Sequence, residues 1–99
     1  MNEIIDDQQI SAHAKDTDQL ALYHRPTCSY CLRVRYGAHK LGADLELRDT
    51  REPVHHEELV AERGRARVPV LRITAADGTE TWMPESAAII QYLKARFER

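Results

Sequence analysis

The stretch LALYHRPTCSYC at residues 20–31 is the strongest indication of the fold, because it leads from an apolar run to a closely spaced cysteine pair. Residues 20–23 predict a short buried strand, and residues 24–27 the loop that follows it. Cys28 and Cys31 are the two cysteines of the chain, and apolar residues at helical spacing follow them directly. The sequence therefore predicts a strand, a loop and a helix that carries a dithiol at its start.

The spacing of the two cysteines favours redox chemistry. If Cys28 caps a helix and Cys31 lies one turn further on, their side chains share a face and can form a disulfide. The capping sulfur would lie among unpaired backbone N–H groups, which favour the nucleophilic thiolate. Arg25, three residues upstream, adds a positive charge that works in the same direction. We therefore predict that Cys28 is the nucleophile.

Two other roles for the cysteines carry less weight. A disulfide across so short a loop would restrict the unfolded chain little, so a purely stabilising bridge is a weak alternative. A zinc site is the other alternative, since CxxC pairs bind metal and His55 with His56 could complete the ligands. However, a long helix follows the cysteines here, instead of the glycine or basic turn residues of a zinc ribbon.

Length and composition describe a single globular domain. The chain has 99 residues, enough for one core, and 42% of them are hydrophobic. No apolar run approaches the roughly 20 residues of a membrane span, and no secretory signal is visible at the start. We therefore expect a cytoplasmic protein with no membrane partner, in a compartment where CxxC beside a strand is more often catalytic than structural.

The net charge of −2 hides an uneven distribution. Residues 1–18 carry five acidic residues and one lysine, whereas residues 19–99 carry eleven acidic residues and thirteen lysines or arginines. We expect residues 1–18 to be a flexible acidic tail and residues 19–99 to be the folded domain. The mildly basic charge of that domain suits a small anionic partner better than a nucleic acid.

The order of the expected elements predicts an α/β domain. After the cysteines we expect a helix at 29–41, a strand at 45–48, a helix at 53–64, strands at 68–73 and 80–83, and a helix opened by Pro84. The order β-α-β-α-β-β-α predicts a four-stranded mixed sheet, with a parallel pair, an antiparallel hairpin and helices on both faces.

This order, with CxxC at the end of the first strand, resembles the glutaredoxin and thioredoxin-like fold. Residues 25–31, RPTCSYC, are similar to the glutaredoxin active-site segment, in which a basic residue, proline and threonine precede Cys-Pro-Tyr-Cys. Val68-Pro69 is similar to the Val-Pro of that family, whose proline is cis and faces the cysteines. Glu85-Ser86 resembles the end of the N-terminal domain of glutathione transferases, which is itself a glutaredoxin-like domain.

The resemblance implies a glutathione-dependent thiol-disulfide oxidoreductase. Cys28 would accept glutathione from a mixed disulfide, and Cys31 would be the resolving thiol. The implied partners are glutathione, as co-substrate, and glutathionylated or disulfide-containing proteins. The enzyme is expected to be a monomer.

The resemblance also assigns residues to glutathione. Val68 would pair with the cysteinyl residue as an added strand, and Pro69 would lie near the sulfurs. Glu85 would bind the γ-glutamyl ammonium, and Ser86 the adjacent carboxylate, unless Ser86 merely caps the helix. The remaining expected contacts lie around the cysteines: Arg25, which could reach the glycyl carboxylate, Thr27 and Tyr30.

The chain also differs from these families, which leaves alternatives open. Ser29 replaces the usual proline, and some relatives with serine there hold a [2Fe–2S] cluster in a glutathione-dependent dimer, through the residue corresponding to Cys28. Residues 83–86 replace the Gly-Gly-Asp segment of typical glutaredoxins. We expect no helical second domain of a transferase, which argues against conjugation chemistry. A non-catalytic, transferase-like binding domain is the other alternative.

Several remaining residues are assigned structural roles. Trp82 and Tyr92 are isolated aromatics, typical of a core or its rim. Arg63, Arg65 and Arg67 form a small basic cluster, for which we favour a solvated loop over an anion-steering role.

Overall fold

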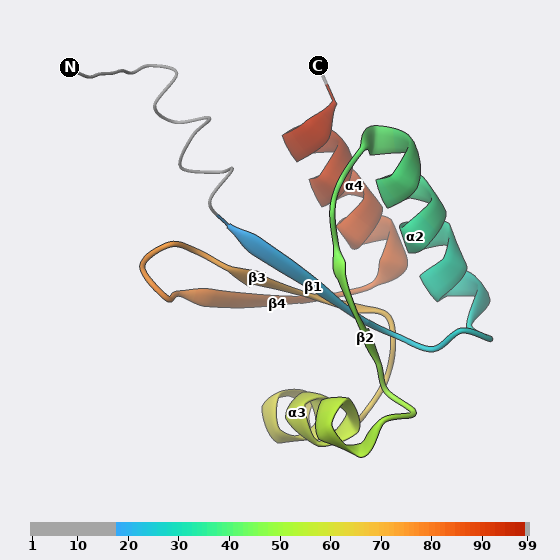
Figure 1. Ribbon diagram of the computed structural model, residues 1–99, viewed down its shortest axis with the longest axis vertical. Helices are drawn as coiled ribbons and strands as arrows, with labels where there is room; N and C mark the ends of the chain where they lie inside the picture. Colours follow the sequence, from blue (N-terminus) through green and yellow to red (C-terminus); the bar gives the residue numbers. More distant parts are fainter. Residues whose placement is uncertain (1–17, 99) are drawn as a thin grey trace.

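The computed structural model describes residues 18–98, which form one mixed sheet with helices on both faces (Figure 1). The elements in chain order are β1 Gln19–His24, α2 Ser29–Leu41, β2 Glu46–Asp49, α3 Pro53–Arg63, β3 Val70–Thr74, β4 Glu80–Pro84 and α4 Ser86–Phe97. The predicted order β-α-β-α-β-β-α is confirmed. Of the predicted acidic tail, only Asp18 lies within the described part of the chain.

The sheet has the strand order β2-β1-β3-β4. The first strand, β1, pairs with β2 in parallel and with β3 in antiparallel, and β3 pairs with β4 in antiparallel. Both the predicted parallel pair and the predicted hairpin are therefore present. Because α2 follows β1 directly, the turn that carries Cys28 lies at the carboxyl end of β1, an interior strand of the sheet.

Successive residues of β1 point to opposite faces of the sheet, which explains the two cores. Leu20 and Leu22 belong to the larger cluster, under α2 and α4, whereas Tyr23 joins Leu59 and Val70 beneath α3. Figure 1 shows α2 and α4 side by side on one face and α3 alone on the other. Among residues 18–98, no helix is long and apolar enough to cross a membrane.

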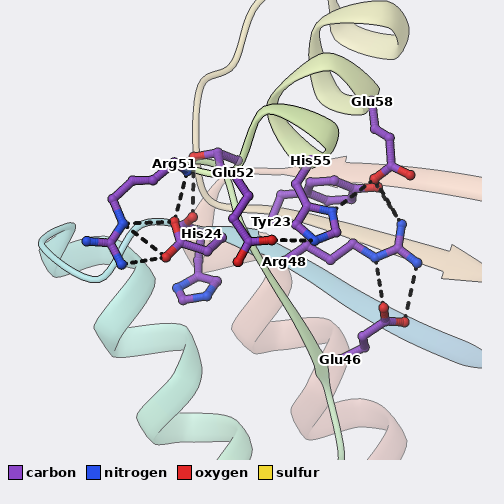
Figure 2. A network of polar contacts seen from close by, with 10 residues as sticks. Tyr23, His24, Glu46, Arg48, Arg51, Glu52, His55 and Glu58 are labelled. Carbon is purple, nitrogen blue, oxygen red and sulfur yellow. Dashed lines mark hydrogen bonds and ion pairs between the residues drawn. The ribbon is translucent and has the colours of Figure 1, made fainter.

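A polar network connects β1 to α3 on this second face (Figure 2). The hydroxyl of Tyr23, whose side chain is buried, donates to Glu58 Oε1 at 2.9 Å and accepts from Arg48 Nη1 at 2.9 Å. Arg48 also contacts Glu58 at 3.2 Å, and His55 Nδ1 lies 3.3 Å from the same carboxylate oxygen. Because buried polar groups are costly when unpaired, this network stabilises the packing of α3 on the sheet.

The start of the last helix differs from the prediction. Pro84 does not open a helix; it is the last residue of β4 and pairs with Val70. A proline is tolerated there because β4 is an edge strand, where a missing N–H donor need not leave an acceptor in a neighbouring strand unpaired. The helix α4 therefore begins at Ser86, with Glu85 in the capping position.

Candidate functional site

Cys28 caps α2, as predicted. Its Sγ accepts a hydrogen bond from the backbone N–H of Cys31 at 3.3 Å, and its backbone carbonyl accepts from Leu32 N at 3.0 Å. Its own N–H donates to the carbonyl of Arg25 at 3.1 Å, which closes the turn before the helix. Cys28 is a partly exposed free thiol. A sulfur that accepts an N–H at a helix start is in an environment that stabilises negative charge.

Cys31, one turn further along α2, is in a different environment. Its side chain is fully buried, and it is a free thiol in this structure. Burial, and secondarily its contact with Cys28, raises the pKa of the Cys31 thiol to about 12. Cys31 therefore keeps its proton near neutral pH, and Cys28 is the cysteine that a substrate can reach.

A cavity of about 420 Å³ opens between the start of α2, the segment before β3 and the junction of β4 with α4. It brings together five of the residues predicted to bind glutathione: Tyr30, Val68, Pro69, Glu85 and Ser86. Arg25, Thr27, Cys28 and Cys31 are not among the residues that line it. Arg25 and Thr27 are exposed in the loop before α2, and Tyr30 connects this turn to the cavity.

Val68 and Pro69 line one wall of the cavity. The peptide bond between them is cis, as the resemblance implied, and Pro69 is buried. The predicted strand at 68–73 begins later, at Val70. Pro69 has no N–H to donate to a ladder, which is consistent with the later start.

Glu85 and Ser86 also line the cavity, at the start of α4. Glu85 has a φ of 78°, and it is the one non-glycine residue with positive φ between residues 18 and 98. Such a backbone conformation is sterically costly and concentrates at functional sites. Ser86 is the first helical residue, so the alternative that it caps α4 is wrong. The cavity thus contains a carboxylate followed by a hydroxyl and by the free N–H groups of a helix start.

Three arginines complete the lining of the cavity: Arg63, Arg65 and Arg67. All three are exposed. The sequence pattern favoured a solvated loop for this cluster and gave no reason to place it at the site. The one available signal was an arginine at every second position, which puts three cationic side chains within five residues.

His24 ends β1, immediately before the cysteine loop. Its side chain is buried, and its Nδ1 has no hydrogen-bond partner within the described part of the chain. Burial, followed by the nearby charge of Arg35, lowers the pKa of His24, although Asp49 opposes this shift. A neutral histidine is therefore favoured at this position.

Residues 18–98 contain no cluster of three or more His, Cys, Asp or Glu side chains able to hold a metal ion. His55 instead contacts Glu58 and Glu52, so it does not join the cysteines in a zinc site. A [2Fe–2S] cluster shared through Cys28 remains a prediction.

A family model of the glutathione S-transferase N-terminal domain matches residues 22–99. The chain belongs to this family. Its sheet order, cis Val68-Pro69 bond and Glu85-Ser86 pair at a helix start therefore belong to a glutathione S-transferase N-terminal domain. No curated protein matches the sequence.

Solved structures similar to this glutathione S-transferase N-terminal domain are much longer proteins. Maleylacetoacetate isomerase from Anaeromyxobacter dehalogenans 2CP-1 is 30% identical with a TM-score of 0.62, over 82% of this chain and 37% of the isomerase. A structure of that isomerase with glutathione in its active site is 28% identical, with a TM-score of 0.63, over 82% of this chain and 38% of the isomerase. A trimeric glutathione transferase from Leishmania is 28% identical with a TM-score of 0.66, over 80% of this chain and 18% of that protein.

Proposed function

We propose that this domain is a glutathione-dependent thiol-disulfide oxidoreductase of the glutaredoxin type. The observation that carries the proposal is the asymmetric cysteine pair: a reachable Cys28 sulfur that accepts an N–H, and a buried Cys31 thiol. A cysteine nucleophile with a second thiol one turn away suits disulfide exchange. The membership in a glutathione transferase family supports glutathione as the co-substrate.

The proposed reaction begins with attack of the Cys28 thiolate on the glutathione sulfur of a mixed disulfide. A new S–S bond joins Cys28 to glutathione, and the partner leaves as a thiolate that takes up a proton. A second glutathione thiolate then attacks the glutathione sulfur on Cys28, which releases glutathione disulfide and restores the Cys28 thiolate. In sum, one free glutathione is consumed: the mixed disulfide and glutathione give the partner thiol and glutathione disulfide, and the proton of that glutathione thiol passes to the leaving thiolate.

The state of Cys31 favours this route over an internal disulfide. To resolve the intermediate, Cys31 would have to act as a thiolate, and burial holds its pKa at about 12. External glutathione is not subject to that restriction, so we propose that it is the main resolving thiol. The main contribution of Cys31 would then be its backbone N–H, which donates to the Cys28 sulfur.

In the proposed complex, glutathione occupies the cavity of Val68, Glu85 and Ser86. The Glu85 carboxylate would bind the γ-glutamyl ammonium, and Ser86 with the first N–H groups of α4 would bind the neighbouring carboxylate. The backbone of Val68 would pair with the cysteinyl residue. A related isomerase has glutathione bound in its active site, which supports glutathione as the ligand.

The test is glutathione-dependent reduction of the mixed disulfide of glutathione and 2-mercaptoethanol. The rate is measured as the consumption of NADPH by glutathione reductase, which reduces the glutathione disulfide formed. We expect activity in the native chain and in Cys31→Ser, and none in Cys28→Ser. A native chain that binds glutathione but does not turn over would instead indicate a transferase-like binding domain. Full activity in Cys28→Ser would refute the assigned nucleophile.

A further inference from the structure

The arginine cluster of Arg63, Arg65 and Arg67 is held at the cavity by the way the chain leaves α3. Arg63 is the last residue of the helix, and Gly64, with a φ of 83°, ends it in the left-handed conformation. In the segment that follows, Ala66 packs against the core cluster beneath α3, whereas Arg65 and Arg67 on either side of it are exposed. The alternation places apolar contacts on one side of the segment and guanidinium groups on the other.

The charges of the arginine cluster are not neutralised by the domain itself. Within residues 18–98, none of the three arginines has a carboxylate within 4 Å, whereas Arg48 and Arg72, for example, are paired with Glu58 and Glu80. The residues that line the cavity include one acid, Glu85. The cavity therefore has three cationic side chains and one anionic side chain at neutral pH.

Glutathione alone does not match this charge. It has one ammonium and two carboxylates, and the proposed complex pairs the ammonium with Glu85 and one carboxylate with the start of α4. Arg25, the residue first expected at the glycyl carboxylate, does not line the cavity, whereas Arg67, next to Val68 in the chain, does and would bind that carboxylate. Arg63 and Arg65 are then left without a partner in glutathione, although they face the same cavity.

We propose that Arg63 and Arg65 bind the protein half of the substrate and select cysteines that have acidic residues beside them. The inference rests on the proposed oxidoreductase function, because that half reaches the cavity through its disulfide to glutathione. The guanidinium fork binds carboxylates in a bidentate manner, and unpaired cations at a cavity mouth attract an anionic partner. The attack of Cys28 is unchanged: the acidic peptide leaves as its thiol, and glutathione stays on Cys28.

The test compares three glutathionylated peptides of one length that differ only in the residues flanking cysteine: Glu and Asp, Gln and Asn, or Lys. With the full chain at low salt, we expect kcat/KM for the acidic peptide to exceed that for the neutral one about tenfold, and the basic peptide to be slowest. Added salt should reduce the difference, since exposed charges are screened. In the Arg63→Gln/Arg65→Gln variant, the kcat/KM for the acidic peptide divided by that for the neutral peptide should be close to one.

Lys94→Gln is the matched control, because Lys94 is exposed on α4 and does not line the cavity. It should keep the native ratio. Equal rates for all three peptides, or an acidic preference that persists in Arg63→Gln/Arg65→Gln, would overturn the proposal and leave the oxidoreductase function intact. Failure to reduce any of the peptides, and the 2-mercaptoethanol mixed disulfide as well, would refute the oxidoreductase function together with the proposal.

Discussion

The backbone N–H of Cys31 donates to the sulfur of Cys28 at 3.3 Å, while the thiol of Cys31 itself is fully buried. Cys31 thus contributes to the site and to the core: its main chain donates to the Cys28 sulfur, and its side chain is buried. This arrangement makes the two cysteines chemically distinct although they are three residues apart.

We predict that iodoacetamide modifies Cys28 first. Cys28 is partly exposed, whereas Cys31 is buried and its pKa is raised to about 12, so little thiolate forms there at neutral pH. Peptide mass spectrometry after a short reaction near pH 7 identifies the labelled residue. Cys31 should react only after unfolding in urea, and its modification before Cys28 in the folded protein would reverse the assigned roles.

Glu85→Ala should weaken glutathione binding without changing the reactive sulfur. Loss of a charged hydrogen-bond partner for the ammonium costs about 1.5–3 kcal/mol, so we expect KM for glutathione to rise roughly tenfold or more. The rate of Cys28 alkylation should be unchanged. Glu57→Ala, which removes an exposed carboxylate on α3, is the control and should keep the native KM.

Glu85→Gly should have the same binding defect but a more stable fold. The φ of 78° at Glu85 strains any residue with a Cβ, and glycine relieves that strain. We expect the free energy of unfolding in urea to exceed that of Glu85→Ala by about 1 kcal/mol. Equal stabilities of the two variants would show that the backbone at this site is not strained.

Local signals explain most of what the sequence predicted correctly. Cys28 caps α2 and Gly42 ends it with a φ of 72°, because both positions depend on neighbours within one turn. The cis Val68-Pro69 bond came from the family resemblance rather than from such a signal.

What the sequence did not reveal depends on contacts between distant segments. Pro84 is compatible with a helix start and with the end of an edge strand, and its pairing with Val70 decides between them. The arginine cluster is visible as a pattern, but its place at the cavity requires the segment before β3 to line the same cavity as Glu85. Neither relationship is encoded within a short window of the chain.

Tyr23→Phe should destabilise the fold by about 1–3 kcal/mol. The substitution removes the hydroxyl that donates to Glu58 and accepts from Arg48, so each of these partly buried charged groups loses one hydrogen bond while the Arg48–Glu58 pair remains. Urea unfolding gives the change in free energy. Tyr36→Phe is the matched control, because Tyr36 is 65% exposed on α2. A similar loss in both variants would mean that the Tyr23 network contributes nothing specific.

The burial of His24 should make the fold less stable as the pH falls from about 7.5 to 5.5. Burial and Arg35 lower the pKa of His24 below its ordinary 6.5, so the unfolded chain binds a proton more readily than the folded protein. The neutral His24 ring therefore makes its full contribution to the free energy of unfolding above pH 6.5, and this contribution declines as the pH falls below 6.5. Urea unfolding across this range should show a shallower pH dependence in His24→Asn than in the native chain. His39→Gln, at an exposed position of α2, should keep the native dependence, and an unchanged slope in His24→Asn would exclude His24 as its source.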